Sequence, residues 1–361
     1  MEIPIQNIYY LLSYAWNKLD ETERMEISTD DYKDSINLLC RVLVAGVNHL
    51  LKKGVDKSYI AITKEYPGIK GRIDFKPSLN KQLFRQGKAI CTYDEFSSNV
   101  VHNQILVATL RRSTRITQLH PSLKKQVWEC LHRFPNVDEI DPIDDINAEM
   151  HLFRQVRIHR NNYGYDLLLR VCRMILENAV LNEEEGTYTF RDFTRNEKAM
   201  ASLFEEFVRN FYTREQQTFQ VRREDIQWQV EAGLDSELSL LPKMQTDITL
   251  EAEDQKIIID TKYYRNMFSS NYETEKFHSG NLYQIYSYIT NIAKDSRNPN
   301  NASCDGILLY PTTQKEIDAT YQIGSHKLRI ATVNLAEKWE RIHDRLLGLV
   351  GVSGVDEVIE G

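Results

Sequence analysis

Cysteine, glycine and proline are all scarce in this chain of 361 residues, and no long apolar run occurs in it. The 15 glycines and 9 prolines exclude a collagen-like or low-complexity protein, and 42% hydrophobic with 27% charged residues is typical of a globular one. Apolar stretches such as 42–47 are far shorter than the roughly 20 residues that cross a bilayer. The first residues show no basic stretch and no cleavage site of small residues, so we expect no signal peptide and a cytoplasmic location.

The cysteines and histidines do not predict the chemistry. The five cysteines are odd in number and widely spaced, which excludes a disulfide framework and a Cys-x-x-Cys zinc site. The nine histidines include no His-Glu-x-x-His motif, so a zinc hydrolase is not indicated. The candidate chemistry has to come from carboxylates, lysine and polar side chains.

Charge is unevenly distributed along the chain. Acidic residues outnumber Lys and Arg by 52 to 45, and the net charge of −7 argues against a protein that coats nucleic acid without specificity. Residues 51–90 are the exception, with ten Lys and Arg against three acids. A solvated surface, a contact with phosphates and a contact with an acidic protein partner all explain such a stretch.

Hydrophobic periodicity predicts two domains, with a boundary near residue 158 after a region rich in proline and acids. In the second half, strands alternate with helices, which predicts a mixed sheet covered on both faces; a capping box at 194–197 is expected to open one of the helices. We expect helices near 8–19, 34–51, 100–116, 122–134, 165–181, 281–292 and 339–350, and strands near 226–230, 245–251, 256–264, 306–310 and 328–333.

Two carboxylates and a lysine are predicted to meet on a β-hairpin. The polar segment 251–255 separates two β-branched runs, and a turn centred between Glu253 and Asp254 places Asp247 opposite Asp260, with Cβ atoms roughly 5 Å apart. A divalent cation bound through oxygen ligands compensates for such repulsion, and Mg²⁺ takes one or two carboxylates plus water and phosphate. Lys262 projects from the same face as Asp260. This set suits metal-dependent phosphodiester hydrolysis, although an edge-strand salt bridge is the simpler alternative.

Two helices offer further candidates. Glu205 or Glu206, on the helix after the capping box, is placed to reach the same metal, although a solvated helix face explains each equally well. Gln284 and Tyr288 are four residues apart and therefore share a helix face. Gln-x-x-x-Tyr in this position resembles the additional motif of the RecB-like branch of PD-(D/E)xK nucleases.

Segments along the whole chain resemble the McrC family, the nuclease subunits of McrBC modification-dependent restriction systems. The resemblance implies that Asp247, Asp260 and Lys262 are catalytic. We also expect both aspartates to bind Mg²⁺ and Gln284 and Glu205 to join the site, although the family does not fix a glutamate on the upstream helix. Thr261 stands where relatives are expected to have alanine, and the change is expected to be harmless because it lies on the opposite face. The matching segments are 7–16, 67–73, 195–198, 241–248, 260–264, 274–279 and 281–284.

The same resemblance implies a fold, a partner and a substrate. We expect an α+β domain over 1–158 that docks on a McrB-like AAA+ GTPase hexamer, and a restriction-endonuclease-like mixed sheet flanked by helices over 159–361. The partner would bind the GTP, since this sequence has Gln82 where the first glycine of a Gly-x-x-x-x-Gly-Lys loop ending at Gly87-Lys88 would be. We expect Lys70 and Arg72 to contact this partner, and double-stranded DNA with modified cytosine to be the substrate.

Two alternative functions remain at this point. The first is a regulatory adaptor of an AAA+ NTPase with a vestigial nuclease site, against which the intact Asp247, Asp260 and Lys262 argue. The second is a stand-alone nuclease, against which the large N-terminal half without a DNA-reading motif argues.

Overall fold

The computed structural model describes residues 3–16, 34–134, 137–138, 146–159, 162, 164–230, 240–264, 268–271, 274–314 and 316–352. They divide into two compact units. The sheet unit combines the first helix with everything from residue 193 onward, and the helical unit comprises the residues between them, up to 192. The boundary expected near 158 is therefore wrong: the helix at 165–178 belongs to the helical unit, and the first helix belongs to the sheet unit.

The body of the helical unit is built from α3 (Ser35–Lys53), α5 (Val101–Thr114), α6 (Pro121–Arg133), α7 (Ile146–Gln155) and α8 (Tyr165–Asn178). Asp34 caps α3 by accepting a hydrogen bond from the Asn37 backbone N–H at 3.0 Å. Gly46 allows α3 and α8 to approach closely, since a Cβ there would lie 2.3 Å from Leu168 Cδ2. A short hairpin of β4 (Ala179–Asn182) and β5 (Thr187–Phe190) follows α8.

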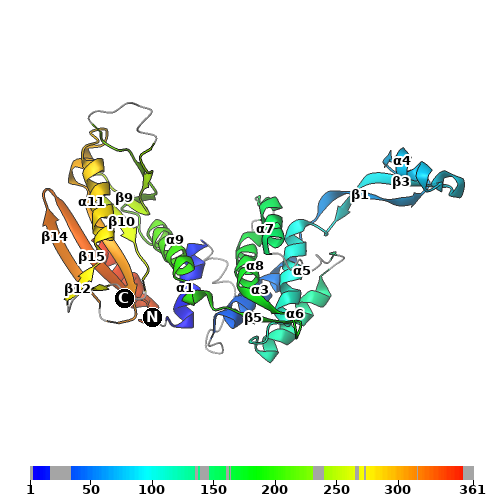
Figure 1. Cartoon of the computed structure of the whole chain (residues 1–361), viewed down its shortest axis with the longest axis horizontal. Helices are drawn as coiled ribbons and strands as arrows, with labels where there is room; N and C mark the ends of the chain where they lie inside the picture. The colour runs from blue at the N-terminus through cyan, green and yellow to red at the C-terminus, as the bar shows by residue number, and fades with distance from the viewer. Residues whose placement is uncertain are drawn as a thin grey trace, which may run out of the picture. The chain divides into compact units, whose positions relative to one another are not determined.

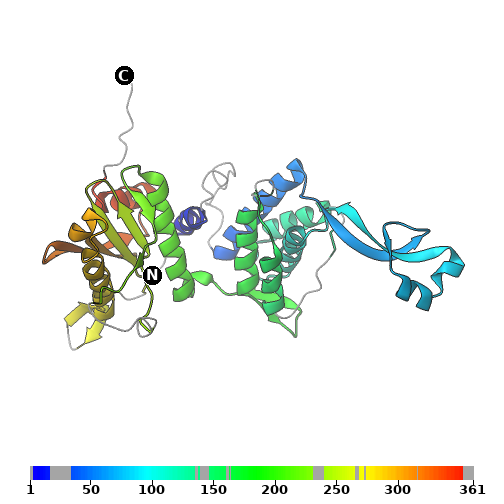
Figure 2. The same ribbon diagram turned by 90° about the horizontal axis from the view of Figure 1, so that it is seen from above.

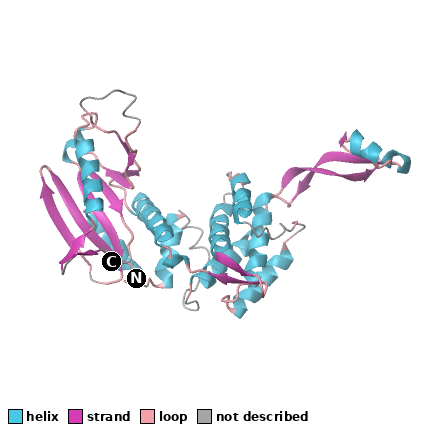
Figure 3. Cartoon of the chain, viewed as in Figure 1, coloured by secondary structure: helices cyan, strands magenta, loops and turns pink. Residues whose placement is uncertain are grey.

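A two-stranded arm extends from this body (Figure 1). Its strands β1 (Ser58–Pro67) and β3 (Lys88–Ser97) pair antiparallel along their whole length, and β2 (Arg72–Ile73) adds to the other side of β3. The helix α4 (Phe75–Asn80) and the 3₁₀ turn η1 (Leu83–Gln86) form the tip (Figure 3). The Asn103 side-chain amide donates to the carbonyls of Asp56 and Ser98 at 2.9 and 2.8 Å, so one side chain holds both ends of the arm.

The sheet unit has a six-stranded mixed sheet in the order β14-β15-β13-β10-β9-β6, as predicted for the second half. The central strands β10, β13 and β15 are parallel, whereas β9, β6 and β14 run antiparallel to their neighbours. The strands are β6 (Gln220–Arg222), β9 (Ile248–Glu251), β10 (Lys256–Thr261), β13 (Asp305–Thr312), β14 (Asp318–Ile323) and β15 (His326–Asn334). Two-stranded pairs are formed by β7 (Asp225–Ile226) with β8 (Met244–Gln245) and by β11 (Phe268–Asn271) with β12 (Thr274–Phe277).

One face of the sheet is covered by α11 (Ser279–Ala293), whose Ile285 and Ile289 pack against Ile258 and Leu308 in a shared core. Gly306 allows this close contact, because a Cβ there would lie 2.6 Å from Ile289 Cδ1. The position of α11 against the strands can be followed in Figure 2. This helix therefore reaches the sheet over the strand that contains Asp260.

The opposite side of the unit holds α9 (Glu197–Glu215), α1 (Ile5–Ala15) and α12 (Trp339–Leu349). Tyr10 of α1 stacks on Trp339 at a centroid distance of 4.4 Å, and Tyr14 lies between Phe207 and Trp339 at 5.8 and 5.2 Å. The Asn210 side chain donates to the last carbonyls of α1, those of Tyr14 and Ala15, at 3.0 and 2.9 Å. The first helix is thus an integral part of the sheet unit.

Candidate active site

The predicted hairpin register is confirmed. Strands β9 and β10 pair from Lys256 opposite Glu251 to Ile259 opposite Ile248, and one further step places Asp247 opposite Asp260. Asp247 itself lies just before β9, while Asp260 is inside β10 and opposite Leu308 of the parallel strand β13. The two carboxylates therefore come together where the parallel strands β10 and β13 approach their C-terminal ends.

Asp260 is fully buried, and Lys262 is its close partner. The Lys262 Nζ lies 2.8 Å from Asp260 Oδ2, yet neither carboxylate oxygen of Asp260 has a well-aligned hydrogen-bond donor within the described part of the chain. Burial raises the pKa of Asp260 to about 7; Lys262 opposes this shift, and the charges of Asp247 and Glu205 add to it. For Lys262, burial lowers the pKa, but the contact with Asp260 and the charges of Asp247 and Tyr264 together outweigh it, so that the pKa is raised overall.

Asp247 is held by Thr261. The backbone N–H and the side-chain hydroxyl of Thr261 both donate to Asp247 Oδ2, at 2.8 and 3.0 Å. The change to threonine is expected to be harmless because it lies on the opposite face, yet the Thr261 hydroxyl contacts Asp247. The Thr261 side chain does leave the strand on the opposite face from Asp260, but Asp247 lies at the end of the strand and is reached from that side.

Glu205 is on α9, which packs against the segment just after β10 through Phe204 and Tyr263 at a ring distance of 6.5 Å. Its charge raises the pKa of Asp260, which places it near the two aspartates. Its carboxylate is bound by Arg209 at 3.2 Å and by Arg223. Sequence reasoning missed both arginines, since Arg209 is one turn along α9 and Arg223 comes from the segment after β6.

Gln284 and Tyr288 do share a face of α11, as predicted. The Gln284 side-chain amide donates to the Tyr288 hydroxyl at 2.8 Å. Burial raises the pKa of Tyr288, the Gln284 bond opposes this, and the charges of Asp260 and Asp247 raise it further. The pair therefore lies close enough to the carboxylates to experience their field.

The donor set fits a hard divalent cation. Asp260 offers two buried oxygens without aligned donors, and Asp247 adds a second carboxylate with one oxygen already fixed by Thr261. No cluster of three or more His, Cys, Asp or Glu with metal-binding geometry occurs among the described residues. Mg²⁺ is commonly bound by one or two carboxylates, while water and substrate phosphate complete its coordination shell.

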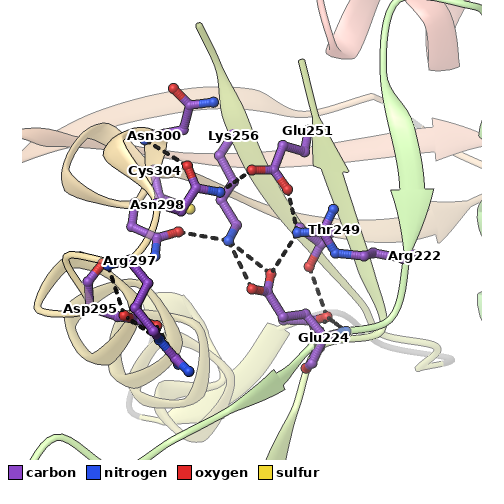
Figure 4. A network of polar contacts seen from close by, with 12 residues as sticks. Arg222, Glu224, Thr249, Glu251, Lys256, Asp295, Arg297, Asn298, Asn300 and Cys304 are labelled. Carbon is purple, nitrogen blue, oxygen red and sulfur yellow. Dashed lines mark hydrogen bonds and ion pairs between the residues drawn. The ribbon is translucent and has the colours of Figure 1, made fainter. Parts of the chain in front are cut away.

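A second buried lysine, Lys256, begins β10 at the end away from Asp260. Its Nζ lies 2.9 Å from the Glu224 carboxylate and 2.7 Å from Asn301 Oδ1 (Figure 4). Arg222 pairs with Glu251 in the same network. Because Lys256 is paired with Glu224 and Asn301, this network anchors the strand and is not a second candidate centre.

Lys70 and Arg72 are in the helical unit, on the arm, and do not take part in the carboxylate centre. The Lys70 ammonium lies 3.9 Å from the centroid of the Tyr93 ring, and Arg72 is exposed on β2. Sequence reasoning missed that exposed apolar side chains also lie at the tip of the arm. Ile69, Phe75 and Leu79 are 70, 61 and 62% exposed, and Phe84 is 41% exposed.

The fold and the centre together define a mixed α/β protein with two carboxylates and a lysine at the end of adjacent parallel strands. The sequence matches the family model of the McrBC 5-methylcytosine restriction system component over residues 6–311. It is 31% identical over 347 residues to the Type IV methyl-directed restriction enzyme EcoKMcrBC of Escherichia coli (strain K12), covering 96% of this chain and 97% of that protein. The chain therefore belongs to the McrBC 5-methylcytosine restriction system component family, as its sequence resemblance indicates.

Solved structures give weaker likenesses. One is a refined half-complex from a tetradecameric assembly of Thermococcus gammatolerans McrB AAA+ hexamers with bound McrC, with a TM-score of 0.48 and 14% identity over 94% of this chain and 76% of that one. Another is the cryo-EM structure of the Thermococcus gammatolerans McrBC complex, with a TM-score of 0.39 and 15% identity over 58% of this chain and 57% of that one. Within the described residues, no helix is both long and apolar enough to span a membrane.

Proposed function

We propose that this chain is the nuclease subunit of a McrBC-type restriction system and that it hydrolyses phosphodiester bonds in double-stranded DNA containing modified cytosine. The observation that carries the proposal is the meeting of Asp247, Asp260 and Lys262 at the end of β10, with a buried carboxylate that lacks aligned protein donors. The mixed sheet with α9 and α11 on its two sides agrees with a restriction-endonuclease-like fold. Membership in the restriction-system family supports the choice of DNA as the substrate.

The proposed chemistry divides among the named side chains. Asp247 and Asp260 would hold Mg²⁺, which supplies charge compensation for the phosphate and a more acidic bound water. Lys262 remains protonated because of its ion pair with Asp260, and its ammonium is placed to stabilise negative charge that develops on the phosphate. Glu205 and the Gln284–Tyr288 pair border this centre and would orient water and substrate.

The proposed partner is a McrB-like AAA+ GTPase hexamer, which would bind the GTP, and the arm is the surface proposed to dock on it. The tip combines exposed apolar side chains with Lys70 and Arg72, and an exposed apolar cluster rimmed by charge is typical of a protein interface rather than of a DNA-binding surface. The Pro67–Arg72 turn, where Gly71 has a positive φ of 68°, presents both cations at this tip.

Cleavage of a methylated plasmid tests the proposal. The purified chain is combined with its AAA+ partner, GTP and Mg²⁺, and Asp247→Ala, Asp260→Ala and Lys262→Ala are expected each to abolish cleavage while partner binding is kept. Asp254→Ala, which removes an exposed acid from the turn of the same hairpin, is the matched control and should cleave normally. Wild-type-like cleavage by any of the three variants would contradict the role assigned to that residue.

The second candidate, a regulatory adaptor with a vestigial nuclease site, predicts a different outcome. GTPase stimulation would persist and no cleavage would occur in any metal. The preserved geometry of the carboxylates and Lys262 favours the nuclease.

A further inference from the structure

Thr261 makes two hydrogen bonds to a single oxygen of Asp247. Its backbone N–H donates at 2.8 Å and its hydroxyl at 3.0 Å, both to Oδ2. Thr261 is the last residue of β10 and is 8% exposed, so little solvent competes for these bonds. Any residue except proline keeps the N–H at position 261, but only threonine or serine supplies a hydroxyl on Cβ.

Asp247 needs such support because the strand ladder does not fix it. The regular pairing of β9 with β10 begins at Ile248, one residue after Asp247, and β8 ends at Gln245, two residues before it. A carboxylate in such a link rotates about χ1 and χ2 unless donors select one orientation. Two donors on Oδ2 select it, and they leave Oδ1 as the oxygen that a cation would use.

We infer that Thr261 is a positioning residue for the metal site, whose hydroxyl orients the Asp247 carboxylate for cation binding. The inference rests on the proposed function, in which Asp247 binds a divalent cation. Hydrogen-bonded partners of metal ligands commonly change metal affinity or activity by 10- to 100-fold when removed. We therefore expect Thr261→Val to weaken divalent-cation binding by roughly 10-fold or more, with the protein still folded.

Two substitutions of Thr261, to valine and to serine, distinguish a role in orienting Asp247 from a role in filling space in the core. Valine keeps the shape and the strand preference of threonine but lacks the hydroxyl, whereas serine keeps the hydroxyl and loses the methyl group. If Thr261 only fills space in the core, valine is the better tolerated substitution. If its hydroxyl positions Asp247, the order is reversed for metal binding, and serine restores most of the affinity.

The experiment titrates Mn²⁺ and Ca²⁺ into the full-length chain and follows binding by calorimetry and by the rise in Tm. In parallel, cleavage by the assembled complex is measured against Mn²⁺ concentration. Thr261→Val should raise the half-maximal Mn²⁺ concentration by roughly 10-fold while kcat at saturating metal recovers, and Thr261→Ser should stay close to wild type.

The outcomes distinguish the two levels of inference. Wild-type cation affinity in Thr261→Val, or valine binding the cation better than serine, overturns the positioning role and leaves the proposed function in place. A wild-type chain that binds no divalent cation and cleaves equally well in EDTA overturns the proposed function and this inference with it.

Discussion

The Lys262 ammonium lies 2.8 Å from the carboxylate of Asp260, two residues earlier on the same face of β10. This ion pair only partly offsets the burial of Asp260, whose pKa is raised to about 7. Protons and divalent cations therefore compete for Asp260 near neutral pH. Both the stability of the protein and its metal binding should depend on pH as a result.

Stability without metal should fall as the pH rises toward 7. The native state keeps a proton on Asp260 that the unfolded chain releases near the ordinary value of 3.8, so between these values the native state binds more protons and alkali favours unfolding. The effect is on the order of a few kcal/mol. Asp260→Asn cannot ionise, so its free energy of unfolding in EDTA should be higher than that of wild type at pH 8 and should lack the part of the fall between pH 4 and 8 that comes from Asp260. Urea unfolding between pH 4 and 8 measures the free energy of unfolding of both proteins. A wild-type stability that increases with pH would contradict the burial of a protonated carboxyl.

Divalent cations should reverse this loss of stability. A cation that binds only the native state raises its stability by mass action. Mg²⁺, Mn²⁺ or Ca²⁺ is therefore expected to raise the Tm of wild type, more strongly at pH 8 than at pH 6, because protons no longer compete. The Asp260→Asn variant should show a smaller rise. An equal rise in wild type and variant would place the cation elsewhere on the chain.

Glu205 and Glu206 should differ in their effect on cleavage. Arg209 pairs with both, at 3.2 and 3.7 Å, so either substitution removes one partner of the same arginine. Of the two, it is Glu205 whose charge contributes to the raised pKa of Asp260. Glu205→Gln is therefore expected to reduce cleavage roughly 10-fold or more, and the matched Glu206→Gln to stay near wild type. Equal rates for the two variants at limiting Mg²⁺ would remove Glu205 from the site.

Charge reversal on the arm should act through the partner. Arg72→Glu, and Lys70→Glu, which also removes the contact with the Tyr93 ring, are expected to weaken stimulation of the partner's GTPase in the absence of DNA. Lys57→Glu makes the same charge change at the base of the arm, on an exposed residue, and is the control. A DNA-binding role would give normal stimulation with weaker DNA binding and a shallower dependence of that binding on salt.

The Lys256 network should matter for stability and not for catalysis. Lys256→Met leaves Glu224 and Asn301 without their shared donor, and Glu224 is still partly reached by solvent, so the loss is expected to be about 2–4 kcal/mol. Lys294→Met, on an exposed lysine of the same unit, should cost less than about 0.5 kcal/mol. Folded Lys256→Met protein should cleave at the wild-type rate per molecule; a specific loss of cleavage would extend the active site to this end of β10.

The sequence predicts features that depend on nearby residues. The turn between two β-branched runs is sufficient to set the register that brings Asp247 opposite Asp260. Spacing along one helix is sufficient to pair Gln284 with Tyr288. Both predictions depend only on the periods of strands and helices, which hold wherever the element is packed.

Where a feature depends on distant contacts or on competing local signals, its prediction from the sequence was wrong or missing. The expected capping box begins at Thr194, but Asn196 caps α9 by accepting from the backbone N–H groups of Lys198 and Ala199. The strand expected at 226–230 ends at Ile226, and beyond it the backbone N–H of Gln229 donates to Asn291 Oδ1 at 3.0 Å instead of to a neighbouring strand. The hydroxyl contact of Thr261 appears only once the end of β10 and the segment before β9 are placed together.

The position of α1 has a consequence for synthesis of the protein. Its Leu11 and Leu12 are buried, and Tyr10 and Tyr14 stack on Trp339, so α1 contacts α12 although the whole helical unit lies between them in the sequence. The whole helical unit is translated before α9 and α12 emerge, and α1 has no native partner during that time. A chain interrupted before Trp339 already contains Asp247, Asp260 and Lys262 but not the helix that completes the core around α1. The core around α1 is therefore complete only after α12 has been synthesised, so folding of the sheet unit waits for a segment far from α1 in the sequence.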